Sequence, residues 1–283
     1  MQDALDNYHA TLLSIWKSSH TLEESGFEFW PLLSSPPMWK GVEVNDVEVV
    51  TLGLNPSYVH NVLEKHWKEA QNEHNSMLEK WPGALKWDKK QSDESRKEFY
   101  DAVLRLDRYS REAYNSYYAP IKELVCLAGK GNVWYHMDVF PLRETNQKDF
   151  ISKIPIPKKD KEKVTLDASK LISKSPKSYE WGSAMSKLFD ACIELINDLQ
   201  PTVVVVLNSY VSRMLEHRLE LQVQSNGHRY ESDKLPEVVF LLGSQLSGGA
   251  TSIYGKERLL ADLRDVVRGN NGLDGGKVRR GQV

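Results

Sequence analysis

The stretch Gly53-Leu54-Asn55-Pro56-Ser57 is the first place in the sequence where residue types and spacing could support chemistry. The apolar, β-branched residues 47–52 just before it predict a buried strand. Gly53 permits a tight turn or a close backbone approach, and Pro56 prevents the strand from continuing. Asn55 is therefore expected at the carboxyl end of a central strand, where open α/β sheets bind ligands. Ordinary turn chemistry is the alternative, because Asn-Pro-Ser is also a common turn sequence.

Two further expected strands also end in polar loops. Residues 132–140 form an apolar run that contains His136 and Asp138, and residues 238–242 precede the Gly/Ser-rich turn 243–249. Alternate side chains of a strand point to the same face, so His136 and Asp138 should lie on one side of the sheet. Carboxyl ends of parallel strands meet at one edge, so the polar loops are expected to converge there. The alternative is that polar loops simply cap buried strands.

The elements that must position these residues can be read from hydrophobic periodicity. Expected helices cover residues 1–25, 117–128, 181–199, 208–219 and 255–267, and one more buried strand covers residues 202–207. Four apolar strands separated by helices predict a three-layer α/β/α sandwich with a central, mainly parallel four-stranded sheet. We expect one domain over residues 1–269 with a charged helical insertion at about 59–115, followed by a polar tail at 270–283.

Composition excludes several classes of protein. The chain of 283 residues has no run near the roughly 20 apolar residues that a membrane span requires. Its first 20 residues lack the basic segment of a signal peptide. Cys126 and Cys192 both lie in apolar helical segments, so we expect reduced core cysteines and a cytoplasmic protein. Two cysteines cannot ligate an iron–sulfur cluster, and no His/Cys spacing resembles a zinc site; we expect no metal, no cofactor and a monomer.

The net charge of −2 argues mildly against nucleic acid, because phosphate contacts require Lys and Arg. The charge is unevenly distributed, however. Basic residues gather in one segment and in the tail, at Lys153, Lys158, Lys159, Lys161, Lys163, Lys277, Arg279 and Arg280. A solvated surface is the simpler explanation of such a run.

Taken in chain order, the strand-end motifs resemble the uracil-DNA glycosylase superfamily. The family carries Gly-x-(Asp or Asn)-Pro-x after its first strand, as in 53–57, and x-Pro-Ser-x-Leu-Ser after its last strand. Here the closing segment is Leu242-Gly243-Ser244-Gln245-Leu246-Ser247. Between the two motifs the family has a base-reading Asn followed by an Arg, and this chain has Asp138 and Arg143. The resemblance covers about residues 45–267 and implies a monofunctional DNA glycosylase that flips a base out of duplex DNA and leaves an abasic site.

The resemblance also implies roles for individual residues. Asn55 would position the attacking water, as in the branch of thymine-DNA and mismatch-specific uracil glycosylases. Leu246 would enter the duplex as an apolar wedge, although a core leucine is the alternative. Contacts to the flipped base are expected from Gly53, Leu54, Ser57, Tyr58, Asp138 and Phe140. The stacking aromatic could be Tyr58, Phe140 or a member of the Tyr114–Tyr118 cluster. Contacts to the DNA strand are expected from Ser244, Gln245, Ser247 and Arg143.

Two departures from the family pattern bear on the substrate. Leu242 stands where the family has a His that stabilises the leaving base anion, and Asp138 replaces the base-reading Asn. An ionised Asp can only accept hydrogen bonds, which suits the exocyclic amine of cytosine. Ser57 leaves room for a C5 substituent where the uracil-only branch has Tyr. The expected substrate is therefore a C5-modified cytosine, such as glucosylated 5-hydroxymethylcytosine in phage DNA, and the expected setting is anti-phage defence.

Several alternatives stay open from the sequence. His136 could protonate the leaving base, hydrogen-bond to Asp138, or be an ordinary core residue. Asp138 could accept hydrogen bonds from loop amides around 143–145. At the level of function, the alternatives are a uracil or thymine mismatch glycosylase, a non-catalytic module that binds modified DNA, and a hydrolase of free nucleosides.

Overall fold

The computed structural model describes eleven segments, namely residues 2–18, 28–29, 47–56, 92–95, 97–98, 114–130, 134–144, 146–153, 183–225, 227–246 and 251–271. Most of the expected insertion at about 59–115, and nearly all of the expected tail, lie outside the described residues. The predicted domain boundaries are therefore left as predictions. No helix in the described segments is long and apolar enough to cross a membrane.

Four parallel strands form the centre of the sheet. They are β2 (Val49–Gly53), β3 (Trp134–Asp138), β5 (Val203–Val206) and β8 (Val239–Leu242), in the spatial order β3-β2-β5-β8. Each matches a strand predicted from an apolar run. β2 and β5 are buried throughout, which explains their Val-rich sequences, and the first four residues of β3 are buried as well.

The sheet is mixed and has six strands among the described residues, so the predicted number of four is wrong. β7 (Arg229–Glu231) and β6 (Gln222–Val223) form a hairpin that extends the sheet antiparallel to β8. Both strands are short and largely exposed, so they lack the apolar run that reveals the others. A separate antiparallel ladder joins β1 (Glu28–Phe29) to β4 (Leu142–Arg143).

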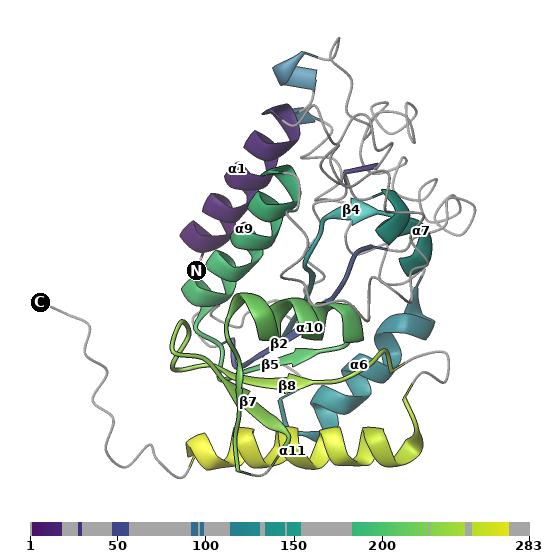
Figure 1. The fold of residues 1–283 in the computed structure, drawn as a ribbon, viewed down its shortest axis with the longest axis vertical. Coiled ribbons are helices and arrows are strands. Elements are labelled where there is room, and N and C mark those ends of the chain that lie inside the picture. Colours follow the sequence, from purple (N-terminus) through teal and green to yellow (C-terminus); the bar gives the residue numbers. More distant parts are fainter. Residues whose placement is uncertain are drawn as a thin grey trace, which may run out of the picture.

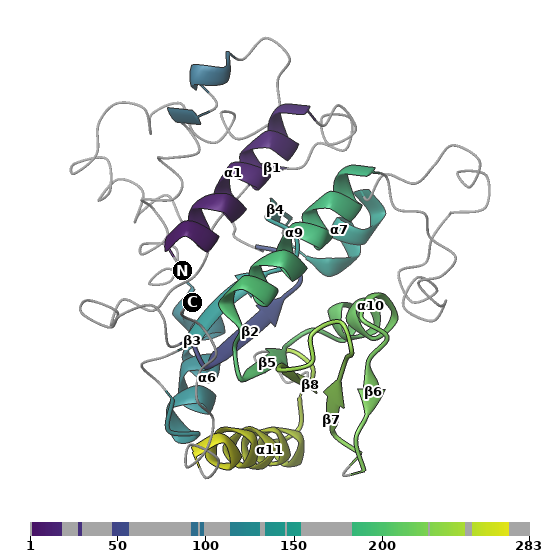
Figure 2. The same ribbon diagram turned by 90° about the vertical axis from the view of Figure 1, so that its left-hand side faces the viewer.

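Helices cover both faces of this sheet (Figures 1 and 2). α9 (Ser183–Leu199) and α10 (Ser209–Arg218) lie on one face, with α1 (Gln2–Ser18) packed against α9. α6 (Asn115–Leu127) and α11 (Ile253–Asn271) lie on the other. α7 (Gln147–Lys153) follows β4. The described chain is thus an α/β fold with helices in two layers around one sheet.

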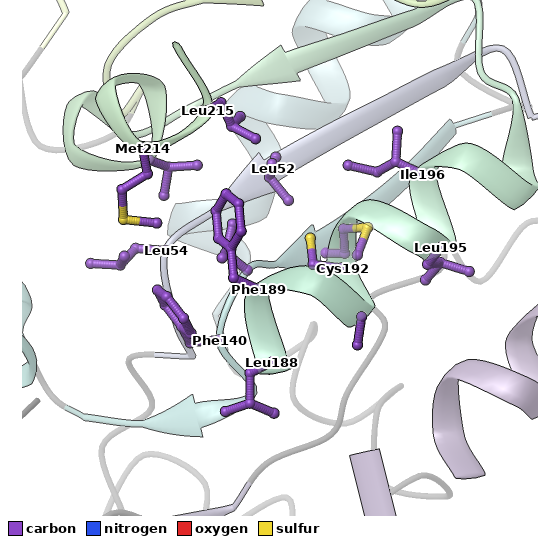
Figure 3. Close-up of a cluster of buried hydrophobic side chains, with 14 of the residues drawn as sticks. Leu52, Leu54, Phe140, Leu188, Phe189, Cys192, Leu195, Ile196, Met214 and Leu215 are labelled. Atoms are coloured by element: carbon purple, nitrogen blue, oxygen red, sulfur yellow. The ribbon is translucent and has the colours of Figure 1, made fainter. Parts of the chain in front are cut away.

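The alternation of strand side chains divides the core between these layers. Val50, Leu52, Val204, Val206 and Phe240 pack with α1, α9 and α10 in a first cluster, part of which is drawn in Figure 3. Their neighbours along the strands, Val49, Val203, Val205 and Leu241, pack with α6 and α11 in a second cluster. Cys192 is buried in the first cluster, whereas Cys126 is exposed on α6, so the expectation of two core cysteines is half right.

The strand order creates a crevice at one edge of the sheet. The chain leaves β2 towards β3 on one side, while β5 lies on the other side of β2 and leads towards β8. Connections that diverge in this way leave a ligand-binding crevice at the carboxyl ends of the strands. Backbone hydrogen bonds continue past the strand ends, from Val139 N to Gly53 O at 3.1 Å and from Leu207 N to Leu52 O at 2.8 Å. These bonds hold the polar loops side by side.

Candidate functional site

A cavity of about 230 Å³ lies at this crevice. It is lined by Gly53, Leu54, Asn55, Pro56, Tyr114, Tyr117, Tyr118, Asp138, Asn146, Gln147, Leu207, Asn208 and Gln245. The structure therefore brings together five of the residues proposed from sequence: Gly53, Leu54, Asn55, Asp138 and Gln245. The predicted convergence of the loops after the first two strands is confirmed.

Asn55 is held in one orientation by the backbone around it. Its Nδ2 donates to the carbonyl oxygens of Pro56 at 3.0 Å, Leu142 at 3.3 Å and Glu144 at 3.1 Å. The amide of Glu144 in turn donates to Pro56 O at 3.1 Å. Because the nitrogen is committed to these carbonyls, Oδ1 is the group that Asn55 offers to the cavity. The side chain is thus a fixed hydrogen-bond acceptor.

Gly53 makes room for the carboxyl group of Asp138. The two residues are register partners on β2 and β3. A Cβ atom at position 53 would overlap with Asp138 Oδ1 and would make a tight contact of 3.1 Å with the Tyr117 hydroxyl oxygen. The sequence suggested either a tight turn or a close backbone approach at Gly53. The structure supports the close approach.

Asp138 is a weak acid in this setting. Its side chain is only 12% exposed, and burial raises its pKa from 3.8 to about 7. Near neutral pH the carboxyl group is therefore divided between its two forms. When protonated it can donate one hydrogen bond and accept others, as an amide can. The expectation that Asp138 acts only as an ionised acceptor needs correction, since it applies only above about pH 7.

His136 lies beneath this carboxyl group and does not line the cavity. Thr51 Oγ1 donates to Tyr135 O at 3.1 Å and lies 2.9 Å from His136 Nδ1, so Nδ1–H donates to Thr51. Nε2 then lies 3.5 Å from the Tyr117 hydroxyl and 3.9 Å from Asp138 Oδ1. Burial lowers the pKa of His136 to about 3, which makes the ring neutral at physiological pH. His136 and Asp138 share one side as predicted, but a proton-donating role for His136 has no support in this geometry.

Three tyrosines from the start of α6 form an aromatic wall of the cavity. The rings of Tyr117 and Tyr118 meet edge to face with centroids 5.1 Å apart, and both meet His136 edge to face at 5.5 Å. Burial, and then the Asp138 carboxyl group, raise the pKa of Tyr117, so its hydroxyl stays protonated. With Tyr114, these rings offer the kind of surface on which a planar base stacks. The sequence named this cluster as one of three candidates.

Two apolar residues predicted at the site are core residues instead. Phe140 is 1% exposed, and its ring packs against Phe150 and Phe189 with centroids 5.6 and 6.4 Å apart (Figure 3). It does not stack on anything in the cavity. Leu246 is 4% exposed and packs in the second core cluster, so the expected wedge is not presented to solvent. In both cases burial in the core removes more apolar surface from water than an exposed position would.

The remaining predicted residues contribute less. Ser244 is half-buried and does not line the cavity, and neither does Arg143 on β4. Lys153, from the basic segment, forms an ion pair with Glu144. Three of the predicted site residues lie outside the described part of the chain: Ser57, Tyr58 and Ser247.

The sequence missed a pair of amides in the lining of the cavity, Asn208 and Gln147. Asn208 caps the N-terminus of α10, with Oδ1 accepting from Tyr210 N at 2.9 Å and Val211 N at 3.1 Å. Its Nδ2 donates to Gln147 Oε1 at 3.0 Å. A signal for Asn208 was present, because it follows the predicted strand 202–207 and precedes a predicted helix, as a capping residue does. Gln147 gave no such signal.

No group of three or more His, Cys, Asp or Glu side chains is placed to hold a metal ion in the part of the chain that the structure describes. The described cavity instead offers amides, phenols and one carboxyl group.

The fold and the cavity define an α/β protein with a small polar cavity at the switch point of a mixed sheet. No protein-family model matches the chain, and neither a curated protein nor a solved structure does.

Proposed function

We propose that this protein is a monofunctional DNA glycosylase that excises a C5-modified pyrimidine, with a modified cytosine as the favoured substrate. The observation that carries the proposal is the orientation of Asn55. Three backbone carbonyls occupy its nitrogen, so its oxygen is the group offered to the cavity. A hydrogen-bond acceptor at the position of Asn55 can hold a water molecule through one of the water O–H groups. The oxygen of that water molecule then stays free to attack C1′. We further propose duplex DNA as the partner, a monomer as the working form and the cytoplasm as its location.

The proposed reaction consumes one water molecule. The C1′–N1 bond breaks with its electron pair going to the base, a C1′–O bond forms, the water loses a proton and the base gains one. Positive charge develops on the sugar and negative charge on the base, so a fixed acceptor beside the water and fixed donors beside the base both favour the transition state. An amide is a weak base, so Asn55 orients the water and the cationic sugar makes it reactive.

Asp138 supports a pyrimidine as the flipped base. In its protonated form, a carboxyl group can donate to the N3 acceptor of cytosine and accept from its N4 amine. The same form can pair with O4 and N3–H of uracil. The ionised form only accepts, and it would repel O4 of uracil while still accepting from the cytosine amine. With a pKa of about 7, Asp138 favours cytosine increasingly as the pH rises above neutrality.

The size of the cavity also fits one base. Its volume of about 230 Å³ is below the roughly 300–1,000 Å³ typical of sites for drug-sized ligands. Tyr117 and Tyr118 provide aromatic faces for a planar ring. The described cavity therefore accounts for the pyrimidine itself.

The fold supports the same proposal. The resemblance to the uracil-DNA glycosylase superfamily implies a parallel sheet between helical layers with motifs at strand ends. The four central strands are parallel and have helices on both faces. The first motif and Asp138 meet in one cavity, and Gln245 of the closing motif joins them.

The test is an alkali-cleavage assay on matched duplexes that carry uracil, a G·T mismatch, 5-hydroxymethylcytosine or glucosylated 5-hydroxymethylcytosine. Wild type is compared with Asn55→Ala. The substitution removes the donor to three carbonyls, so it should also cost about 1–3 kcal/mol of unfolding free energy. Ser232→Ala is the matched control, because Ser232 is buried and donates to Leu219 O, and neither residue lines the cavity. Thermal melting verifies that both variants are folded at the assay temperature.

Strand breaks at a modified cytosine that Asn55→Ala abolishes and Ser232→Ala retains are the expected result. Breaks at uracil or the G·T mismatch would keep the reaction and replace the substrate. Full cleavage by Asn55→Ala would refute the proposal. Binding to modified duplexes without any breaks would favour a non-catalytic DNA-binding module.

A further inference from the structure

Two amides that line the cavity, Asn208 and Gln147, form a relay that starts at the backbone of α10. Asn208 Oδ1 accepts from Tyr210 N and Val211 N. Because these two bonds fix Oδ1 towards the backbone of α10, Asn208 Nδ2 points away from that backbone. That nitrogen donates to Gln147 Oε1 at 3.0 Å. The oxygen of Gln147 is therefore committed to Asn208. Among the described residues Gln147 Nε2 has no hydrogen-bond partner, so Gln147 has an N–H donor left for the cavity that it lines.

The contact between the two side chains is not needed to cap the helix. Capping uses only Oδ1 of Asn208, and the hydroxyl of Ser212 and the amide of Ser212 already bond to Asn208 O. The contact from Asn208 Nδ2 to Gln147 joins residues 61 positions apart. Its effect is on Gln147, because it determines which end of that amide faces the cavity.

The Asn55 and Gln147 side chains thus present opposite groups. Asn55 has its nitrogen held by carbonyls and offers an oxygen. Gln147 has its oxygen held by an N–H group and offers a nitrogen. An acceptor suits a water molecule, whereas a donor suits an atom that gains negative charge.

We propose that Gln147 donates a hydrogen bond to the departing pyrimidine anion and that Asn208 is the positioning residue that aims it. This inference rests on the proposed glycosylase function. Gln147 would supply the donor that this chain lacks at position 242, because Leu242 stands where the resemblance would place an anion-stabilising His. When the C1′–N1 bond breaks, the electron pair stays on the base and delocalises from N1 onto the carbonyl oxygen O2, and the Nε2–H group of Gln147 stabilises that charge without transferring its proton.

Two substitutions reverse the group presented while retaining the local contacts. Gln147→Glu keeps an oxygen that accepts from Asn208 and replaces the donor with a second oxygen. Asn208→Asp keeps the helix cap, because Asp caps as well as Asn. The new carboxylate cannot donate, so Gln147 must turn its nitrogen towards position 208 and its oxygen towards the cavity. Asn208→Asp therefore reverses the orientation of the Gln147 amide without a substitution at position 147.

Each variant should lose about 10²–10³ in kcat, the cost of removing one donor to a developing anion. The loss should also depend on the leaving base. It should be smaller for 5-formylcytosine, whose formyl group stabilises the anion itself, than for 5-methylcytosine. A merely structural effect would reduce both rates by the same factor. Adding Asn208→Asp to Gln147→Ala should cause no further loss, because Asn208 acts only through Gln147.

Gln222→Glu is the matched control. Gln222 is exposed on β6, and its Nε2 donates to Glu220 O, so the same chemical change is made away from the cavity. Its rates should equal those of wild type for both bases. Thermal melting should give the same midpoint for Asn208→Asp and wild type.

Calorimetric binding of free bases tests the donor without any cleavage. At about pH 6.5, below the pKa of about 7 of Asp138, 5-nitrouracil is largely an anion and thymine is neutral. Wild type should bind the anion at least about tenfold more tightly, and Gln147→Glu should lose that preference. An unchanged preference in Gln147→Glu, or no binding of either base to wild type, would overturn the inference. Anion preference without cleavage of any duplex would retain the donor site and reject the glycosylase.

Discussion

Replacing Asp138 by Asn should remove a pH-dependent penalty on folding. Burial beside Gly53 raises the pKa of Asp138 from 3.8 to about 7. In that interval the folded protein keeps a proton that the unfolded chain has lost, so its stability falls as the pH rises. The penalty is absent below pH 3.8 and complete above about pH 7. Asn has the same shape and cannot ionise.

The size of the effect follows from the width of the interval. One unit of pKa difference is worth about 1.36 kcal/mol, so the two units from about pH 5 to pH 7 correspond to about 3 kcal/mol. Because the Asp138 side chain is 12% exposed, water reduces this figure somewhat. His136 contributes an opposite trend, since its pKa of about 3 makes the fold lose stability as the pH falls below 6.5. That trend is common to wild type and variant and cancels in their difference.

Urea denaturation at about pH 5 and about pH 8.5, followed by tryptophan fluorescence, measures the difference. The unfolding free energy of Asp138→Asn should rise relative to wild type by up to about 3 kcal/mol between these two pH values. Asp198→Asn is the control, because Asp198 is exposed near the end of α9 where the chain enters β5, at the opposite end of that strand from the cavity. It should retain the pH dependence of wild type. If the unfolding free energies of Asp138→Asn and wild type differ by the same amount at both pH values, Asp138 is not a buried acid with a raised pKa.

Two predictions concern the neighbours of Asp138. His136→Leu should reduce the cleavage rate by less than about tenfold, because His136 does not line the cavity and Thr51 still donates to Tyr135 O. A loss above about 10² in the folded variant would indicate that His136 takes part in the reaction. Tyr117→Ala should weaken binding to a duplex with a modified base by about 1–3 kcal/mol, because a stacking surface is lost, whereas Tyr117→Phe should bind as wild type does. Equal losses in the two Tyr117 variants, measured by fluorescence anisotropy, would contradict stacking.

Much of the fold could be predicted because its signals are local. Unbroken β-branched runs mark β2 and β5, which are buried on both faces. The helix predicted over residues 117–128 ends at Leu127, and Gly129 just beyond it has φ of +88°, a conformation that favours glycine. The β6–β7 hairpin could not be predicted in this way, since its strands are two and three residues long and carry no apolar pattern.

The site was predictable to the extent that strand ends converge. Asn55 and Asp138 each follow an apolar run, and parallel pairing places them at one edge. Phe140 and Leu246 show the limit of that reasoning. Both follow strands and both are apolar, but their burial depends on tertiary partners. Phe140 packs against Phe150 and Phe189, and Leu246 packs in the second core cluster.

The sequence by itself determined which polar side chains stand at the carboxyl ends of the strands. Only the tertiary structure decided which atom of each is offered to the cavity. An amide has a donor and an acceptor of nearly equal size, so its orientation depends on what holds the other end. For Asn55 that partner includes Leu142 O, 87 positions away, and for Gln147 it is Asn208, 61 positions away. The acidity of Asp138 has the same origin, because it depends on the burial that packing around Gly53 creates.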